Sequence, residues 1–172
     1  MIVTYRNASF ADAETMSALG TQTFVETFGH LYSPANLQLF LANHSPANWA
    51  KELADPAFAV RIAEVEGRAI GYAKLGPAHL PIDAGDRRAT ELRQLYVQSD
   101  WHGSGIAVTL TDWVLEEARA RSAQDIYLSV FTENPRAQAF YRRYGFVEVG
   151  RYLFMVGDHG DEDLLMRLHL DD

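Results

Sequence analysis

Apolar residues recur every three or four positions in the first third of the chain, which is the period of a helix with one buried face. Three such runs predict three helices. Their apolar positions are Met16, Leu19, Phe24 and Phe28 in the first run, Leu37, Phe40 and Leu41 in the second, and Trp49 and Leu53 in the third. Ser9 and the Ser45-Pro46 pair are typical starts for the first and third helices. An alternating segment, Ile2 to Asn7, precedes them and predicts a short strand.

The spacing changes to a period of two between residues 58 and 75, which is typical of strands. A turn at Glu66-Gly67-Arg68 interrupts this region, so we expect a hairpin. Residues 76–88 combine Gly, Pro, Asp and Arg without periodicity. That stretch is therefore expected to be a surface loop and the most mobile part of the chain.

The second half predicts strands that alternate with two helices. Strands are expected at 90–97, 126–131, 146–156 and 164–170, with the acidic run 158–163 as a solvated turn. A helix at 104–121 carries an apolar stripe, and a shorter one begins at Asn134-Pro135 and ends at Gly145. The stripe consists of Ile106, Leu110, Trp113 and Val114. The pattern predicts an α/β (α+β) fold, with a mixed sheet flanked by helices.

The composition narrows the classes of partner. The 172 residues fit one domain, and the hydrophobic fraction of 48% is that of a globular protein. A net charge of -8 disfavours nucleic acid as a ligand. Cysteine is absent, which suits a cytoplasmic protein and removes any thiol nucleophile. No apolar run is long enough to span a membrane, and the first residues are too polar for a signal peptide.

A glycine-rich turn joins the strand at 90–97 to the following helix. It reads His102-Gly103-Ser104-Gly105-Ile106-Ala107. Free backbone N–H groups and the helix dipole point outward together at such a junction, which makes it an anion site. Glycine allows positive φ and a close approach of a phosphate to the backbone. The spacing is neither that of a dinucleotide fingerprint nor that of a P-loop.

The chain resembles the GNAT family of acyl-CoA N-acyltransferases over most of its length, best between Glu91 and Gly150. One motif is an L-x-V strand followed by the glycine loop, present as Leu95-Tyr96-Val97 and then residues 102–107. The other is N-x-x-A-x-x-F-Y-x-x-x-G-F, which runs from Asn134 through Tyr141 to Phe146. The resemblance implies a mostly antiparallel sheet with a splayed parallel strand pair and helices on both faces.

The resemblance also implies a single domain, 1–172, with two functional parts. Residues 1–57 would form the acceptor side, and residues 58–172 the sheet with the CoA-binding core. Acetyl-CoA would be the cosubstrate and a primary amine the acceptor, either a small amine, a polyamine or an amino-acid-like compound. The stretch Thr23 to Phe28 is similar to that of polyamine-acetylating members. Relatives in this family are often dimers, so the resemblance is consistent with a homodimer.

Candidate cofactor-binding residues follow from these motifs. By resemblance, the strand pairs its backbone with the pantetheine arm, and an N–H near Tyr96 polarises the acetyl carbonyl. His102 stands where Gln or Arg is usual and Ser104 where a basic residue is common, so we expect weaker CoA affinity. His102 could instead be a solvent-facing loop residue. The full set is Leu95, Tyr96, Val97, His102, Gly103, Ser104, Gly105, Ile106, Ala107, Asn134 and Tyr141.

The resemblance assigns the catalytic roles to two residues. Tyr141 would protonate the departing thiolate, and Glu91 would take the proton of the amine, directly or through water. Tyr141 could instead be a packing aromatic, and Glu91 an exposed strand charge. Asn134 is both a helix cap and a partner for the cofactor arm, two roles that compete for one side chain.

The acceptor would bind among aromatic and acidic side chains of the first helical region. By resemblance these are Phe24, Glu26, Phe28 and Tyr32. A carboxylate framed by aromatics suits a cationic amine. Phe24 and Phe28 also have the spacing of a core stripe, and at least one of them is expected to be core.

Three other functions stay open: a non-catalytic acyl-CoA-binding or sensor module, a protein N-terminal or lysine acetyltransferase, and a phosphate- or nucleotide-binding domain that uses the glycine turn alone. No metal site is expected, because the histidines are scattered without the spacing of a helical zinc site. They are His30, His44, His79, His102, His159 and His169.

Overall fold

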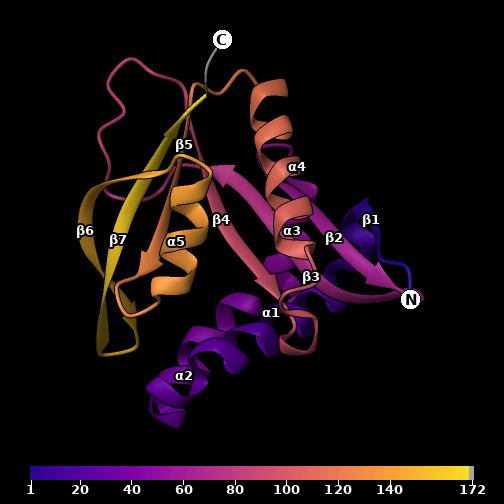
Figure 1. The fold of residues 1–172 in the computed structure, drawn as a ribbon. Helices are drawn as coiled ribbons and strands as arrows, with labels where there is room; N and C mark the ends of the chain where they lie inside the picture. The colour runs from indigo at the N-terminus through magenta and orange to yellow at the C-terminus, as the bar shows by residue number, and fades with distance from the viewer. Residues whose placement is uncertain (171–172) are drawn as a thin grey trace.

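A seven-stranded sheet in the order β1-β2-β3-β4-β5-β7-β6 forms the centre of the computed structural model, which describes residues 1–170 (Figure 1). All neighbouring strands pair antiparallel except β4 and β5, which are parallel. This confirms the predicted mixed sheet with one parallel pair. The strands are β1 (Thr4–Asn7), β2 (Ala59–Val65), β3 (Arg68–Pro77), β4 (Ala89–Val97), β5 (Asp125–Phe131), β6 (Val147–Val156) and β7 (His159–His169).

Five α-helices accompany the sheet in residues 1–170: α1 (Ala13–Phe28), α2 (Pro34–Leu41), α3 (Pro46–Ala54), α4 (Ile106–Ala120) and α5 (Pro135–Arg143). Short 3₁₀ turns are η1 (Phe10–Asp12), η2 (Gly29–Leu31), η3 (Ala42–His44) and η4 (Ser99–Trp101). The Ser45 hydroxyl accepts a bond from the Asn48 amide at 3.2 Å and begins α3 as predicted. Ser9 begins η1, so the α-helical part starts later than its position suggested.

Helices cover both faces of the sheet. One face packs against α4, whose buried residues Ile106, Leu110 and Val114 follow the predicted stripe, while Trp113 is only partly buried. Figure 1 shows α4 and α5 in front of the sheet. The opposite face packs against α1 and α3 through a separate core, which consists of Met16, Leu19, Trp49, Val60, Ile62, Ala69 and Tyr72.

The acidic run 158–163 is not the turn that the sequence pattern had suggested. β6 and β7 form a hairpin whose turn is only Gly157 and Asp158, with Gly157 at φ +61°. The following acidic residues pair with β6, Asp161 opposite Phe154 and Asp163 opposite Tyr152. Pairing with a long partner strand overrides the low strand propensity of Asp and Glu. Two carboxylates therefore lie on one face of β7.

The loop between β3 and β4 is tied to the sheet more firmly than its composition suggested. Leu80 is buried against Tyr127 and Leu165. Arg87 forms an ion pair with buried Asp125, with Nε and Oδ2 2.8 Å apart. The loop therefore covers the same face of the sheet as α1 and α3, next to the core that these helices form with the sheet.

Gly20 provides a test of how tightly α1 packs. A Cβ there would lie 2.5 Å from Nδ1 of buried His44, whose ring is held by Trp49. We expect Gly20→Ala to lower the unfolding free energy by ~1–3 kcal/mol in urea titrations, although the same change in an open helix stabilises. In a His44→Ala background, Gly20→Ala should instead raise the unfolding free energy by ~0.5–1 kcal/mol. Equal effects in both backgrounds would contradict the close contact.

Candidate active site

The two parallel strands separate almost as soon as they meet. β4 and β5 pair only at Ala89, Thr90 and Glu91, and no pairing joins them beyond these residues. Figure 1 shows them diverging toward their C-terminal ends. A register shift in β4 accompanies the separation, because Lys74 pairs with Gln94 but Leu75 pairs with Leu92. The separation leaves the β4 edge that faces β5 without a strand partner.

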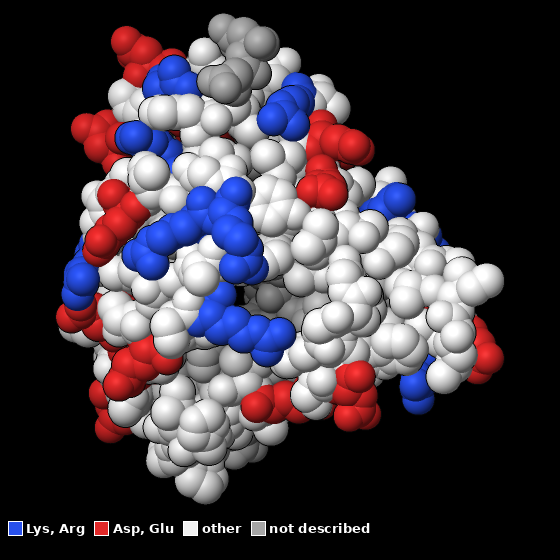
Figure 2. Space-filling view, in the orientation of Figure 1, with Lys and Arg blue, Asp and Glu red and all other residues white. Residues whose placement is uncertain are grey.

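One cavity of about 1080 Å³ extends through this gap to both faces of the sheet. On the α4 side its walls include Gly103, Gly105 and Arg136. On the opposite side they include Tyr32 and Asp163. Figure 2 shows a hollow in the face that carries α4 and α5, with Lys and Arg side chains on its rim. An anion can therefore be met by basic side chains at this mouth, although the net charge of the chain is -8.

The glycine turn has the backbone conformation that an anion site requires. Gly103 and Gly105 have φ of +79° and +85°, and no atom lies within 4 Å of where a Cβ would stand. Gly105 is the N-cap of α4. Within residues 1–170, none of the N–H groups from 103 to 108 donates a hydrogen bond. These amides line an open cradle at the helix N-terminus.

Two exposed side chains of the turn are hydrogen-bonded to the backbone of the turn and of the preceding strand. The His102 ring donates from Nε2 to the Val97 carbonyl at 2.8 Å, and its backbone N–H donates to Ser99. The Ser104 hydroxyl donates to the Trp101 carbonyl. His102 lines the cavity, whereas Ser104 does not. Both side chains hold the turn in shape, which leaves anion binding to the neighbouring amides.

Tyr141 and Asn134 stand on the α5 side of the cavity. Burial raises the pKa of the Tyr141 phenol above its usual value, and within residues 1–170 its hydroxyl has no hydrogen-bond partner. Phe140 also lines the cavity. Asn134 caps α5 by accepting from the Ala137 amide through Oδ1. Its Nδ2 stays available, so the two roles expected for Asn134 do not compete.

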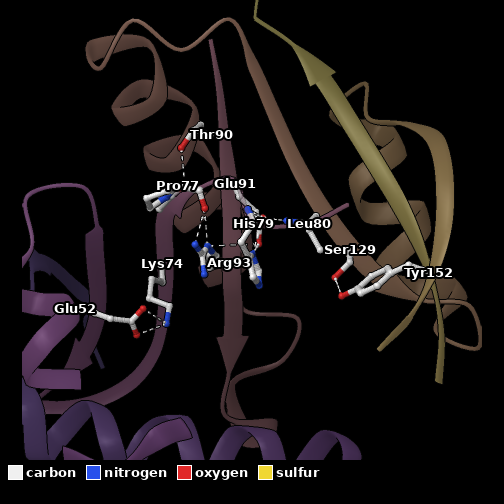
Figure 3. A network of polar contacts seen from close by, with 11 residues as sticks. Glu52, Lys74, Pro77, His79, Leu80, Thr90, Glu91, Arg93, Ser129 and Tyr152 are labelled. Carbon is white, nitrogen blue, oxygen red and sulfur yellow. Dashed lines mark hydrogen bonds and ion pairs between the residues drawn. The ribbon is translucent and has the colours of Figure 1, made fainter. Parts of the chain in front are cut away.

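Glu91 is buried rather than an exposed strand charge, with 2% of its surface accessible. Its Oε1 accepts from the backbone amides of His79 and Leu80 at 2.9 and 3.2 Å. The His79 ring lies 2.8 Å from Oε2, and Arg93 lies 3.5 Å from the same oxygen (Figure 3). Glu91 thus anchors the β3–β4 loop and orients an imidazole that is 60% exposed.

Three of the four expected acceptor-binding residues line the cavity: Phe24, Phe28 and Tyr32. Phe24 is also core, 2% exposed and stacked on Phe40 at 4.2 Å between ring centroids. Glu26 does not line the cavity. Its carboxylate accepts from the Ser99 amide at 3.1 Å and from Gln22 at 3.0 Å. Glu26 points to the outer side of α1, toward η4, because it lies two residues from buried Phe24.

The comparisons with known proteins agree with this geometry. A model described as the acetyltransferase (GNAT) family matches residues 21–146. The chain belongs to the GNAT acetyltransferase family. An uncharacterized N-acetyltransferase of Mycobacterium tuberculosis is 35% identical over 156 residues, covering 90% of this chain and 96% of the relative. An uncharacterized N-acetyltransferase of Lactobacillus delbrueckii is 26% identical and covers 91% of each chain.

Solved structures of GNAT proteins share the fold. The PaiA N-acetyltransferase of Thermoplasma acidophilum, in complex with coenzyme A, aligns with a TM-score of 0.78 at 19% identity, over 99% of this chain and 100% of that one. A ribosomal-protein-alanine N-acetyltransferase of Brucella melitensis aligns with a TM-score of 0.74 at 28% identity, over 97% and 99%. The expected GNAT architecture is confirmed.

Sequence patterns missed two further groups in this GNAT cavity. Lys74, 5% exposed, forms an ion pair with Glu52 at 2.9 Å and lies 4.7 Å from the centre of the Trp49 ring. Burial lowers the pKa of Lys74, while the carboxylate of Glu52 opposes that change. Both residues line the cavity. Lys74 lies on β3 and Glu52 on α3, so only the packing of distant segments brings the two residues together.

The second missed group is Asp163, which is 7% exposed and lines the cavity from β7. Burial raises its pKa from 3.8 to about 6, a hydrogen bond with Ser129 opposes the shift, and the charge of Asp161 adds to it. In residues 1–170, no helix is long and apolar enough to cross a membrane, and no cluster of His, Asp and Glu is arranged to hold a metal ion.

The raised pKa of Asp163 makes a prediction about stability. The folded protein holds this proton up to about pH 6, whereas the unfolded chain loses it near 3.8, so charging the buried carboxylate costs at most ~3 kcal/mol above pH 6. Asp163→Asn should therefore raise the unfolding free energy relative to the parent at pH 7–8, with the difference vanishing below about pH 4. The groups around Asp163 are Tyr32, Tyr96, Ser129, Tyr152 and Asp161.

Urea unfolding of parent and variant across pH 3.5–8 measures the difference. A variant less stable than the parent at pH 8 would show that the native state stabilises the charged form of Asp163.

Proposed function

We propose that this enzyme transfers an acetyl group from acetyl-CoA to a primary amine by direct attack of the amine. One observation carries the proposal: a single cavity connects the free amides at the start of α4 with an aromatic and acidic end on the opposite face of the sheet. The amide cradle suits a pyrophosphate, and the acidic end suits a cationic amine. Residues 1–57 would form the acceptor side, and residues 58–172 the sheet with the CoA-binding core.

The residues present fit CoA. The N–H groups from Gly103 to Val108 would bind its pyrophosphate, and Arg136 and Arg143 stand in the cavity wall for its remaining phosphate charge. The free edge of β4 at Leu95 to Val97 would pair with the pantetheine amides as an added strand does. Asn134 Nδ2 is free to donate to the same arm. CoA supplies the acetyl group as an activated thioester.

Tyr141 would give its hydroxyl proton to the departing sulfur. A C–N bond forms to the amine nitrogen and the C–S bond breaks, so the sulfur leaves with an electron pair that needs a proton. Because burial raises the pKa of the phenol, Tyr141 remains protonated at neutral pH. An N–H near Tyr96 would stabilise the negative charge on the acetyl oxygen.

The ammonium proton must leave before attack, and we propose that the His79 ring, held in place by Glu91, receives it. Both oxygens of Glu91 already have donors, whereas the His79 ring is largely exposed and lines the cavity. The carboxylate orients the ring through Nδ1, which leaves Nε2 to accept the proton. Glu91 would then act as a positioning residue for His79.

Free thiol provides the test of the activity. The chain has no cysteine, so a thiol reagent reports only CoA released from acetyl-CoA. Purified protein with acetyl-CoA should release thiol only when an amine from a panel of monoamines, diamines and amino acids is added. Binding of CoA without thiol release for any amine would instead support the non-catalytic alternative.

Tyr141→Phe should lower kcat by about 100-fold or more, since general acid catalysis contributes at least that factor in many enzymes. Tyr144→Phe is a matched control. It removes a hydroxyl three residues along the chain, from a side chain that does not line the cavity and that donates to Asp112 at 3.0 Å and to the Val108 carbonyl at 3.2 Å. Initial rates at saturating substrates measure both variants. Undiminished turnover of Tyr141→Phe would remove Tyr141 from the proposed role.

Gly105→Ala should raise the Kd for CoA roughly tenfold, because a Cβ at φ +85° distorts the amide cradle. Gly67→Ala is the matched control, since Gly67 has φ +76° and open space around it but lies in the β2–β3 turn. Calorimetry with CoA should show the change for Gly105 alone. ATP binding as tightly as CoA would favour the nucleotide-binding alternative.

A second candidate acceptor is the N-terminal amine of a protein. It is favoured by the Brucella ribosomal-protein-alanine N-acetyltransferase, whose alignment with this chain has 28% identity. Peptides that begin with alanine, included in the amine panel, separate this possibility from small amines.

A further inference from the structure

Asp163 differs from the other buried carboxylates because it has no cationic partner. Glu91 contacts His79 and Arg93, and Asp125 contacts Arg87 and His169. The ion pairs within residues 1–170 do not include Asp163. A buried carboxylate without a cation is costly unless something else compensates its charge.

The cavity is the place from which compensation can come. Asp163 lines it from the face of β7 that points away from α4, close to Ser129 of β5. Ser129 in turn accepts from the Tyr152 hydroxyl at 3.3 Å (Figure 3). Asp161, two residues away on the same face, is already bound to Tyr32 and to His159. It adds negative potential without competing for the ligand.

Three tyrosines stand around Asp163. Its charge contributes to the raised pKa of Tyr32, Tyr96 and Tyr152, after burial in each case. All three rings line the cavity. A carboxylate in a cavity lined by aromatic side chains can bind ammonium and guanidinium groups, because ring quadrupoles and the anion attract the same charge.

We propose that Asp163 is an anionic subsite that holds a second cationic group of the acceptor, so that the preferred acceptors are diamines or amines with a guanidinium. The inference rests on the proposed amine acetylation and narrows its substrate class. One amine reacts near Tyr96 and Tyr141, while the distal cation pairs with Asp163. An acceptor with a carboxylate at the distal position would meet both Asp161 and Asp163 and be repelled.

Three acceptors of equal length test the subsite. They are 1,4-diaminobutane, butylamine and 4-aminobutyrate, which carry a cation, nothing or an anion at the distal end. The parent enzyme should prefer the diamine to butylamine by about 10- to 100-fold in kcat/KM, and should use 4-aminobutyrate least. Asp163→Asn should raise KM for the diamine by a similar factor, with kcat within about threefold, and should leave butylamine unchanged.

Glu162→Gln is the matched control. Glu162 lies on the other face of β7, half-exposed and paired with Arg151, so its loss removes one charge from the same strand outside the cavity. It should keep the parent preference. Equal use of all three acceptors by the parent, or a fall in kcat of Asp163→Asn for every acceptor with unchanged KM, would overturn the subsite. The second result would make Asp163 the proton acceptor of the reaction.

A binding measurement separates failure of the subsite from failure of the proposed function. Calorimetry of 1,4-diaminobutane with the CoA complex should give a Kd that rises at least tenfold in Asp163→Asn. An enzyme that binds the diamine through Asp163 but turns over no amine would refute the activity and keep the subsite. Turnover of amines, together with identical diamine binding by the parent and Asp163→Asn, would keep the activity and refute the subsite.

Discussion

The separation of β4 from β5 is the constraint on which the rest of the site depends. Each strand is fixed on its outer side, β4 by seven pairs with β3 and β5 by seven pairs with β7, so neither can move across to close the gap. Backbone groups along a gap inside a protein need hydrogen-bond partners. In the proposed function the amides of CoA would be these partners, and the cavity that occupies the gap reaches from one face of the sheet to the other.

Charge is distributed unevenly along this cavity. Basic side chains and free amides gather at the α4 end, whereas carboxylates and tyrosines gather at the opposite end. Lys51, Lys74 and Arg93 also line that end, where Lys74 is paired with Glu52 and Arg93 lies beside Glu91. Opposite ends of one passage therefore attract ligands of opposite charge, and the local pattern matters more than the net charge of the chain.

Much of this architecture could be predicted from the sequence, because helices and strands with one buried face leave a periodic pattern. The glycine turn and the Asn134 to Phe146 segment are local motifs, so their positions beside the cavity could be anticipated. The β6–β7 hairpin could not, since pairing with β6 decides that Asp161 and Asp163 belong to a strand. Similarly, the sequence pattern places Glu26 on the first helix but does not show that its carboxylate accepts a hydrogen bond from the Ser99 amide of η4. Contacts between distant segments carry the information that local patterns lack.

The reach of the cavity to both faces of the sheet has a kinetic consequence. Two ligands that approach from opposite faces need not pass each other, so each can occupy its end while the other is present. Direct attack of the amine on the thioester, as proposed above, needs both ligands bound at once. An enzyme of the proposed kind would work through a ternary complex, so its double-reciprocal plots would intersect rather than run parallel.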